Sequence, residues 1–294
     1  MTRTTNRAFG ATAPIDLKTV EAHLDQLIDN AFAKRLPIHQ IAELMRGDPR
    51  DHARLGNLPP VVEGELLEQA ITVLASANPD VAVFADCRLP FDPDFVERIR
   101  TMPIELIGKI GAAESRQSRH NYRPDLLLIN GQTGTAHLVD IKRSLNSYDT
   151  IRITHLRHRM LAAAISLPEL LGQAGSKLVL RDIRVAVVNI EAVRPDIERG
   201  IWSMSELDRL IGVPGAAAMI GAMRKTFARR VAAQFAAARQ VLIEDAVRTR
   251  VAILRNSAET KITCNCGHRF KRQPEPAEIT IGFARLADED DGSG

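Results

Sequence analysis

Two short motifs in the middle of the chain carry residues that could perform metal-dependent chemistry. Asp125, preceded by proline, opens the apolar run LLLI, and after a Gly-containing turn the segment HLVDIK contains Asp140 and Lys142. A hairpin returns the second segment to the sheet end where Asp125 lies, and residues two apart on a strand share a face. Carboxylates bind Mg²⁺, the cation lowers the pKa of a bound water, and a nearby lysine offsets charge on a phosphate. The pattern predicts a metal-dependent phosphodiesterase site.

Neither motif is specific by itself. The chain contains four Pro-Asp pairs and three triplets in which an acid precedes a lysine by two residues. Only Pro124-Asp125 and Asp140-Ile141-Lys142 combine with two apolar, strand-like segments and a turn between them. The competing interpretation is an ordinary β-hairpin with an exposed aspartate and lysine.

These two motifs, separated by fourteen residues, resemble those of the PD-(D/E)XK nuclease superfamily. The resemblance covers roughly residues 60–192 and extends to the order of elements, αβββαβ, in the family core. It implies a DNA endonuclease that hydrolyses phosphodiester bonds through a water activated by Mg²⁺ or Mn²⁺. It also implies that Asp125, Asp140 and Lys142 are catalytic residues and that Asp125 and Asp140 bind the metal.

The family places a further metal-binding glutamate on the helix before the first strand. Three glutamates compete for this role, and the resemblance favours Glu68, because a glycine precedes it by four residues and apolar residues follow at the family's spacing. Glu63 fits fairly well and Glu65 fits worst. We therefore expect Glu68 to be both a metal ligand and a catalytic residue.

Basic residues flank the hairpin on both sides. They occur in the preceding segment ESRQSRHNYR and on or just before the helix that follows. Such residues could neutralise phosphates on each side of a cut, which would make binding sensitive to salt. The competing interpretation is a charged loop and a solvated helix face. The residues expected to bind nucleic acid are Arg116, Arg119, Arg123, Arg143, Arg152 and Arg157.

The segment ITCNCGHRF near the C-terminus resembles one knuckle of a zinc ribbon. Its candidate ligands are Cys264, Cys266 and His268, but their C-x-C spacing differs from the usual C-x-x-C and no second cysteine pair exists. A structural zinc needs four ligands, so Cys87 or a second chain would have to contribute. We expect two unpaired thiols in a turn here, not a zinc site.

The hairpin must be held by a larger α/β framework. We expect a mixed central sheet with an αβββαβ nuclease-like core, flanked by N-terminal and C-terminal helical segments. The expected parts are an N-terminal helical arm over 1–58, the core over 59–200, a C-terminal helical region over 201–257, and a small β-hairpin with an acidic disordered tail over 258–294.

Hydrophobic periodicity and turn residues give the individual elements. Residues 16–45 should form two helices divided at Pro37, and the turn-rich stretch 47–60 should be a linker. Further helices are expected over 61–77, around 95–100 and over 151–171. Strands are expected over 81–89, 123–129, 135–142 and 184–190, and two more within 261–286.

The C-terminal region contains a long helical pattern over about residues 219–255. Residues 222–255 carry eight arginines and lysines against two acids. The apolar side of this helix should pack on its own sheet or on a second copy, which makes a homodimer through these helices a candidate assembly. The other interpretation is that its basic face contacts DNA.

Composition narrows the functional classes. Of 294 residues, 45% are hydrophobic and 26% charged, which is a globular balance. Aromatic residues make up 4%, so a single-strand binder that stacks bases on rings is a poor hypothesis. No membrane span, secretory signal or disulfide framework is evident, and we expect a cytoplasmic protein with no membrane partner.

The hypothesis from a different class is a non-catalytic module. A nuclease fold can serve as a nucleic-acid-binding or assembly unit without cutting, because fold does not imply function. The alternative glutamates and the helical segments at both ends motivate this second interpretation. Metal binding distinguishes the two hypotheses.

Overall fold

A computed structural model describes residues 16–101, 120–146, 148–173, 178–192 and 194–263. The chain divides into two compact units, Met1–Glu244 and Asp245–Gly294. The first unit contains the whole sheet and all the candidate site residues that the structure describes. The described part of the second unit is the last stretch of helix α9 (Ala216–Thr263).

Two amphipathic helices begin the first unit. Helix α1 (Leu17–Arg35) starts after Asp16, whose carboxylate accepts a hydrogen bond from the backbone amide of Thr19 at 3.3 Å. Helix α2 (Ile38–Arg46) follows Pro37, which ends the first helix because proline has no amide hydrogen. The two helices expected in residues 16–45 are confirmed.

The third helix overturns one expectation. Residues 47–60 were expected to form a linker, but helix α3 (Pro49–Ala77) runs through Pro59 and Pro60. Asp48 caps the helix by accepting the amides of its first turn. The apolar face stays continuous across the prolines and packs in the main core, through Leu55, Leu58, Val62 and Leu66. Tertiary packing thus outweighs local turn chemistry, and the boundary expected at 58/59 falls inside a helix.

A five-stranded mixed sheet forms the centre of the first unit, in the order β1-β4-β5-β6-β7. Its first three strands pair antiparallel, whereas β6 pairs parallel with β5, and β7 parallel with β6. The segment expected as one strand over 81–89 divides, because Leu89 belongs to a separate two-stranded sheet of β2 and β3. The strands are β1 (Val81–Phe84), β2 (Leu89–Pro90), β3 (Asn121–Tyr122), β4 (Leu126–Asn130), β5 (Thr135–Lys142), β6 (Asp182–Asn189) and β7 (Ile201–Ser203).

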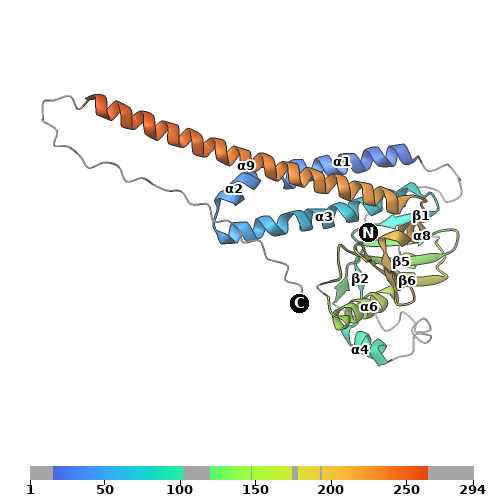
Figure 1. The fold of residues 1–294 in the computed structure, drawn as a ribbon. Helices are drawn as coiled ribbons and strands as arrows, with labels where there is room; N and C mark the ends of the chain where they lie inside the picture. Colours follow the sequence, from blue (N-terminus) through green and yellow to red (C-terminus); the bar gives the residue numbers. More distant parts are fainter. Residues whose placement is uncertain (1–15, 102–119, 147, 174–177, 193, 264–294) are drawn as a thin grey trace, which may run out of the picture. The chain divides into compact units, whose positions relative to one another are not determined.

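Helices cover both faces of this sheet (Figure 1). Alternation along β5 sends Val139 and Ile141 to one face, where the core is shared with α1, α3, α8 (Leu207–Ile211) and α9. Leu138 faces the other side, where α6 (Thr150–Ala164) and α7 (Leu167–Gln173) pack. Helix α4 (Pro93–Thr101), which matches the helix expected around 95–100, packs against α6.

Several boundaries differ from expectation. The helix expected over 151–171 breaks between α6 and α7, where the Ser166 hydroxyl donates to the carbonyl of Ala163 at 2.8 Å. Strand β7 and the 3₁₀ turn η2 (Met204–Glu206) precede α8. Helix α9 continues to Thr263, so the strand expected from Lys261 is wrong for residues 261–263. The rest of the expected hairpin and tail lies outside the described residues.

The mixed α/β class is confirmed by this arrangement of sheet and helices. The elements around the five-stranded sheet follow the order α3, β1, β4, β5, α6 and β6. Among the described helices, none combines the length and apolarity that a membrane crossing requires.

Candidate active site

The β4–β5 hairpin brings the two sequence motifs together. The strands pair in a register that aligns Leu126 with Val139, so Asp125, just before β4, is level with Asp140. The Asp125 Oδ2 atom accepts the backbone amide of Ile141 at 2.6 Å, which fastens this carboxylate to the neighbouring strand. The structure thus places Asp125 and Asp140 side by side at one end of the hairpin.

Asp140 is buried, at 5% exposure; its Oδ2 accepts a hydrogen bond, whereas its Oδ1 has an ion pair but no hydrogen bond within the described residues. The Lys142 ammonium forms an ion pair with Oδ1, and the Tyr122 hydroxyl donates to Oδ2 at 2.6 Å. The same ammonium lies 4.0 Å from Oδ2 of Asp125. Lys142 therefore lies between the two carboxylates, which is where a cation that offsets negative charge is needed.

The three candidate glutamates on α3 have different surroundings. The Glu63 carboxylate pairs with Arg224 of α9 at 2.7 Å, and that of Glu65 pairs with Arg35 of α1 at 2.9 Å. Glu68 instead lines a cavity of about 390 Å³ together with Asp125. Of the three, Glu68 is therefore the one that the structure brings to the hairpin end.

Burial and mutual repulsion raise the pKa values of two carboxylic acids in this site. Burial, followed by the Asp125 charge, raises the pKa of Glu68 to about 7. Burial and the Asp140 charge also raise the pKa of Asp125, although the Ile141 amide opposes that change. Excess negative charge in a partly buried cavity is typical of a site that receives a cation.

The negative charge of Asp140 also raises the pKa values of its two partners, Lys142 and Tyr122. Burial opposes the charged form of Lys142, but the Asp140 and Asp125 carboxylates outweigh it and raise the pKa of Lys142. Burial and the Asp140 charge raise the pKa of Tyr122 far above its ordinary range. Lys142 is therefore a cation at neutral pH, and Tyr122 is a neutral phenol that donates its proton to Asp140.

Tyr122 is the site residue that sequence reasoning missed. It lies in the short strand β3, three residues before Asp125. The sequence offered one indication of its role: it is one of two tyrosines in the chain, and it lies close to the Pro-Asp motif. Spacing alone does not show that its hydroxyl reaches Asp140, because the hydrogen bond depends on how β3 lies beside the hairpin.

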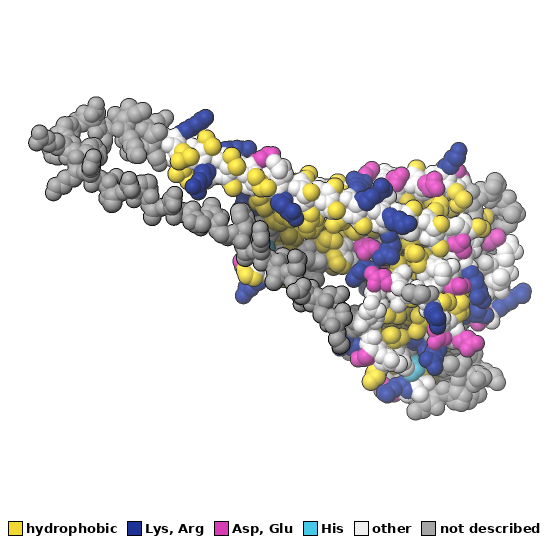
Figure 2. All heavy atoms as spheres, in the orientation of Figure 1, with side chains coloured by type: hydrophobic (Ala, Val, Ile, Leu, Met, Phe, Trp, Pro, Cys, Tyr) yellow, Lys and Arg dark blue, Asp and Glu magenta, His cyan; other side chains and the backbone are white. Residues whose placement is uncertain are grey.

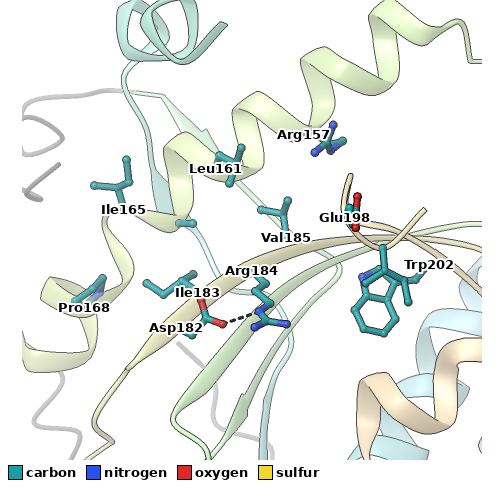
Figure 3. Close-up of a pocket in the computed structure, with 13 residues that line it drawn as sticks. Arg157, Leu161, Ile165, Pro168, Asp182, Ile183, Arg184, Val185, Glu198 and Trp202 are labelled. Atoms are coloured by element: carbon teal, nitrogen blue, oxygen red, sulfur yellow. Dashed lines mark hydrogen bonds and ion pairs between the residues drawn. The ribbon is translucent and has the colours of Figure 1, made fainter. Parts of the chain in front are cut away.

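The arginines expected to bind nucleic acid lie in dissimilar surroundings. Arg123 lines the same cavity as Glu68 and forms an ion pair with Asp86. Arg152 is exposed on α6 and lies 3.8 Å from Asp149. Arg157 lines a separate cavity of about 620 Å³ between α6 and β6 (Figure 3). Arg116 and Arg119 lie outside the described residues.

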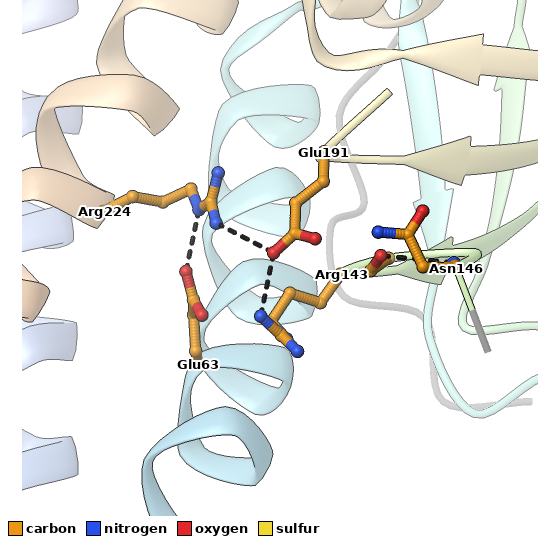
Figure 4. Close-up of polar contacts among 6 residues, drawn as sticks. Glu63, Arg143, Asn146, Glu191 and Arg224 are labelled. Carbon is orange, nitrogen blue, oxygen red and sulfur yellow. Dashed lines mark hydrogen bonds and ion pairs between the residues drawn. The ribbon is translucent and has the colours of Figure 1, made fainter. Parts of the chain in front are cut away.

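Arg143, the sixth of these arginines, belongs to a charge cluster beside the site (Figure 4). Its guanidinium pairs with Glu191 at 2.8 Å, and Glu191 also lies 3.8 Å from Arg224. Arg224 in turn pairs with Glu63 at 2.7 Å. The cluster connects the end of β5 to α3 and α9, so Arg143 has a structural partner as well as a place next to Lys142.

Helix α9 distributes its basic residues along its length. Figure 2 shows Lys and Arg side chains spaced along this helix, with apolar side chains between them. Some are paired within the chain, as Arg230 is with Asp29 at 2.5 Å. Phe227 packs on Phe32 of α1, so this part of α9 packs on helices of its own chain. Packing of α9 on a second copy of the chain, and contact of its basic residues with DNA, remain predictions for the exposed residues of this helix.

The acidic residues fit a magnesium ion only in part. Within the described residues, no group of three or more His, Cys, Asp or Glu side chains is close enough to enclose a metal. Lys142 and Tyr122 occupy the oxygens of Asp140. However, Mg²⁺ in proteins is usually held by one or two carboxylates plus waters, and Glu68 and Asp125 both line an open cavity. The zinc candidates Cys264, Cys266 and His268 lie outside the described residues.

Comparison with known proteins gives no independent assignment. No protein-family model matches the chain, and no match is found among curated proteins or solved structures.

Proposed function

We propose that this protein is a metal-dependent DNA endonuclease of the PD-(D/E)XK type, which hydrolyses phosphodiester bonds. The observation that carries the proposal is the juxtaposition of Asp125, Asp140 and Lys142 at one end of the β4–β5 hairpin. The element order α3, β1, β4, β5, α6, β6 also supports it, because it follows the αβββαβ order that the family resemblance implies.

Each residue of the site has a distinct role in the proposed reaction. Asp125 and Glu68 would hold Mg²⁺ or Mn²⁺, with Asp140 joining them once its contacts rearrange. The bound cation would polarise the phosphate and lower the pKa of a water. Lys142 stabilises negative charge on the phosphate, and Tyr122 orients Asp140. Arg123, at the cavity, is placed to contact a neighbouring phosphate.

The decisive experiment is cleavage of plasmid and linear DNA in the presence of Mg²⁺ or Mn²⁺. We expect Lys142→Ala and Asp140→Ala to lower the cleavage rate by about 100-fold or more. Glu68→Gln should lower it strongly, whereas Glu65→Gln, on the same helix but paired with Arg35, should leave it nearly unchanged. Cleavage that survives Lys142→Ala and Asp140→Ala would come from another site or a contaminant and would refute the proposal.

The second candidate is a non-catalytic nucleic-acid-binding or assembly module on the same fold. The observation that favours it is that Asp140 already has two partners within the chain, an ion pair with Lys142 and a hydrogen bond from Tyr122. Calorimetric titration with Mn²⁺ separates the two functions. Binding that Asp125→Asn abolishes supports the nuclease, whereas DNA binding with no Mn²⁺ binding at millimolar concentration supports the module.

A further inference from the structure

The later part of helix α9 exposes many large apolar side chains. Of the eleven large hydrophobic residues that are exposed within the described part of the chain, six belong to this helix. Figure 2 shows apolar side chains along α9, between its Lys and Arg side chains. Apolar side chains gathered on one exposed surface are typical of a site that binds a partner. The six residues are Val241, Ile243, Val247, Val251, Ile253 and Leu254.

Four of these side chains share one side of the helix. Ile243, Val247, Val251 and Leu254 follow one another at intervals of four, four and three residues. At about 100° per residue, the four positions fall within an arc of about 80° on the helix surface. Their exposed fractions are 51%, 57%, 42% and 61%, respectively. We call these four residues the apolar stripe.

The apolar stripe faces away from the side of α9 that packs on its own chain. That packed side includes Phe227, Ala238 and Leu242, which by helical position lie roughly 160° from the stripe. Earlier in α9, the side that later becomes the stripe carries the exposed residues Lys225 and Arg229. The outer side of the helix is therefore polar at first and becomes apolar after Leu242.

The apolar stripe is nearly symmetric about its midpoint, which lies between Arg248 and Thr249. Ile243 and Leu254 are equally far from this point, and Val247 and Val251 lie on either side of it. A two-fold contact between identical chains requires a surface that is complementary to itself. Two antiparallel copies of the stripe meet this requirement, because Ile243 of each copy is then level with Leu254 of the other.

Charged residues beside the stripe favour the antiparallel orientation. By helical position, Glu244 and Arg255 lie on the same flank of the stripe, one near each end. In an antiparallel pair the two equivalent flanks meet, so Glu244 of each copy lies within one helical turn of Arg255 of the other. A parallel pair would separate these residues by about three helical turns. Opposite charges therefore meet only in the antiparallel pair.

We propose that α9 binds a second copy of this chain through the apolar stripe, in an antiparallel pair with Glu244 of each copy beside Arg255 of the other. The proposal is independent of the endonuclease activity. The contact involves about three turns of each helix, so we expect a dissociation constant on the order of 10 µM. Well below that concentration the chain is a monomer, and its unfolding there does not depend on the stripe.

Sedimentation equilibrium of the full chain, without DNA and at about 1 to 100 µM, tests the proposal. We expect a reversible equilibrium between monomer and dimer. Val247→Asp should raise the dissociation constant at least about tenfold, because it places an unpaired charge in an apolar contact. Ala233→Asp is the matched control, since it adds the same charge at an exposed position before the stripe, and it should leave the dissociation constant nearly unchanged.

Charge reversal tests the orientation. Glu244→Arg and Arg255→Glu should each raise the dissociation constant at least about tenfold, because like charges then meet across the contact. The chain that carries both substitutions should return close to the native value. Both positions are exposed in the single chain, so the variants should fold, and circular dichroism verifies their helix content.

Three results would overturn the proposal. A chain that stays monomeric at about 100 µM would leave the stripe to another occupant, such as residues 264–294 of the same chain. A dimer that Val247→Asp does not weaken would use a different surface. A dimer that the paired charge reversal does not restore would lack the contact between Glu244 and Arg255.

Discussion

The two partners of Asp140 differ in charge and in how far the sequence predicts them. Lys142 is two residues away on the same strand, and alternation alone places both side chains on one face. Tyr122 comes from a separate strand, and its hydroxyl donates a hydrogen bond to a buried carboxylate. A carboxylate of this kind is stable inside a protein only when its oxygens have donors.

Removal of the Tyr122 hydroxyl should therefore destabilise the fold. We expect Tyr122→Phe to lower the free energy of unfolding by about 1.5–3 kcal/mol, since it removes a hydrogen bond to a charged group. Urea denaturation at neutral pH measures the change. Tyr148→Phe removes the other phenolic hydroxyl of the chain, which lies near Lys142 but is not hydrogen-bonded to Asp140, so it should lower stability less. Equal stability of native protein and Tyr122→Phe would contradict the contact.

Glu68 should make stability depend on pH in the metal-free protein. Its pKa is about 7 in the folded chain, above the ordinary value of 4.5, so the folded state holds this proton more tightly than the unfolded state. Stability is then greatest below the ordinary value and falls as pH rises towards 7.

Glu68→Gln should abolish this penalty. In the presence of a chelator, we expect the variant to be more stable than the native protein at about pH 8 and nearly equal at about pH 5. Urea denaturation at the two pH values gives the comparison. Glu65→Gln should show no gain at either pH, because it loses an ion pair with Arg35. A gain for Glu68→Gln that is the same at both pH values would show that its ionisation is not the cause.

At the scale of elements, helix α3 shows where local patterns fail. Pro59-Pro60 and the preceding turn residues predict a linker, because proline weakens a helix interior. The apolar face from Leu55 to Leu66 continues at helical spacing, and its burial against α1 and α2 decides the conformation. Asp48 and Pro49 mark the true start, since aspartate caps helices and proline suits a first turn.

The hairpin shows where local patterns succeed. The predicted strand over 135–142 agrees with β5 at both ends, because alternation and a turn at Gly134 define it locally. The cluster of Glu63, Arg143, Glu191 and Arg224 was not foreseen. Its members come from four separate segments, so only the tertiary structure places them together.

Arg224 is the member of that cluster that fastens α9 to the core elements. Arg224→Met would leave the half-buried Glu63 carboxylate without its ion pair, and we expect a loss of about 1–3 kcal/mol in the free energy of unfolding. Thermal or urea denaturation tests this expectation. Arg229→Met, an exposed position on the same helix whose side chain bonds Thr226, should change stability little. Equal effects of the two substitutions would argue against the cluster.

Across the first unit, one hydrophobic core includes residues from the N-terminal helices, the sheet and α9, which the sequence patterns predict as separate regions. Phe32 of α1 and Phe227 of α9 are in ring contact, with centroids 5.4 Å apart. The same buried cluster includes Trp202 and Val139 of the sheet. Helices from both ends of the sequence thus share a core with the central strands, and the unit should unfold as one cooperative transition.

Phe227→Ala tests this cooperativity from a helical residue of the shared core. Loss of the buried ring should cost about 3–5 kcal/mol, because a cavity remains where Phe227 packed on Phe32. Trp202 fluorescence reports the sheet, and circular dichroism reports mainly the helices, so both transitions should move together to lower urea. Val251→Ala, at an exposed position further along α9, should shift neither. If Phe227→Ala moved the helical signal and left the Trp202 transition in place, the helices would be independent of the sheet, as domain boundaries at both 58/59 and 200/201 would require.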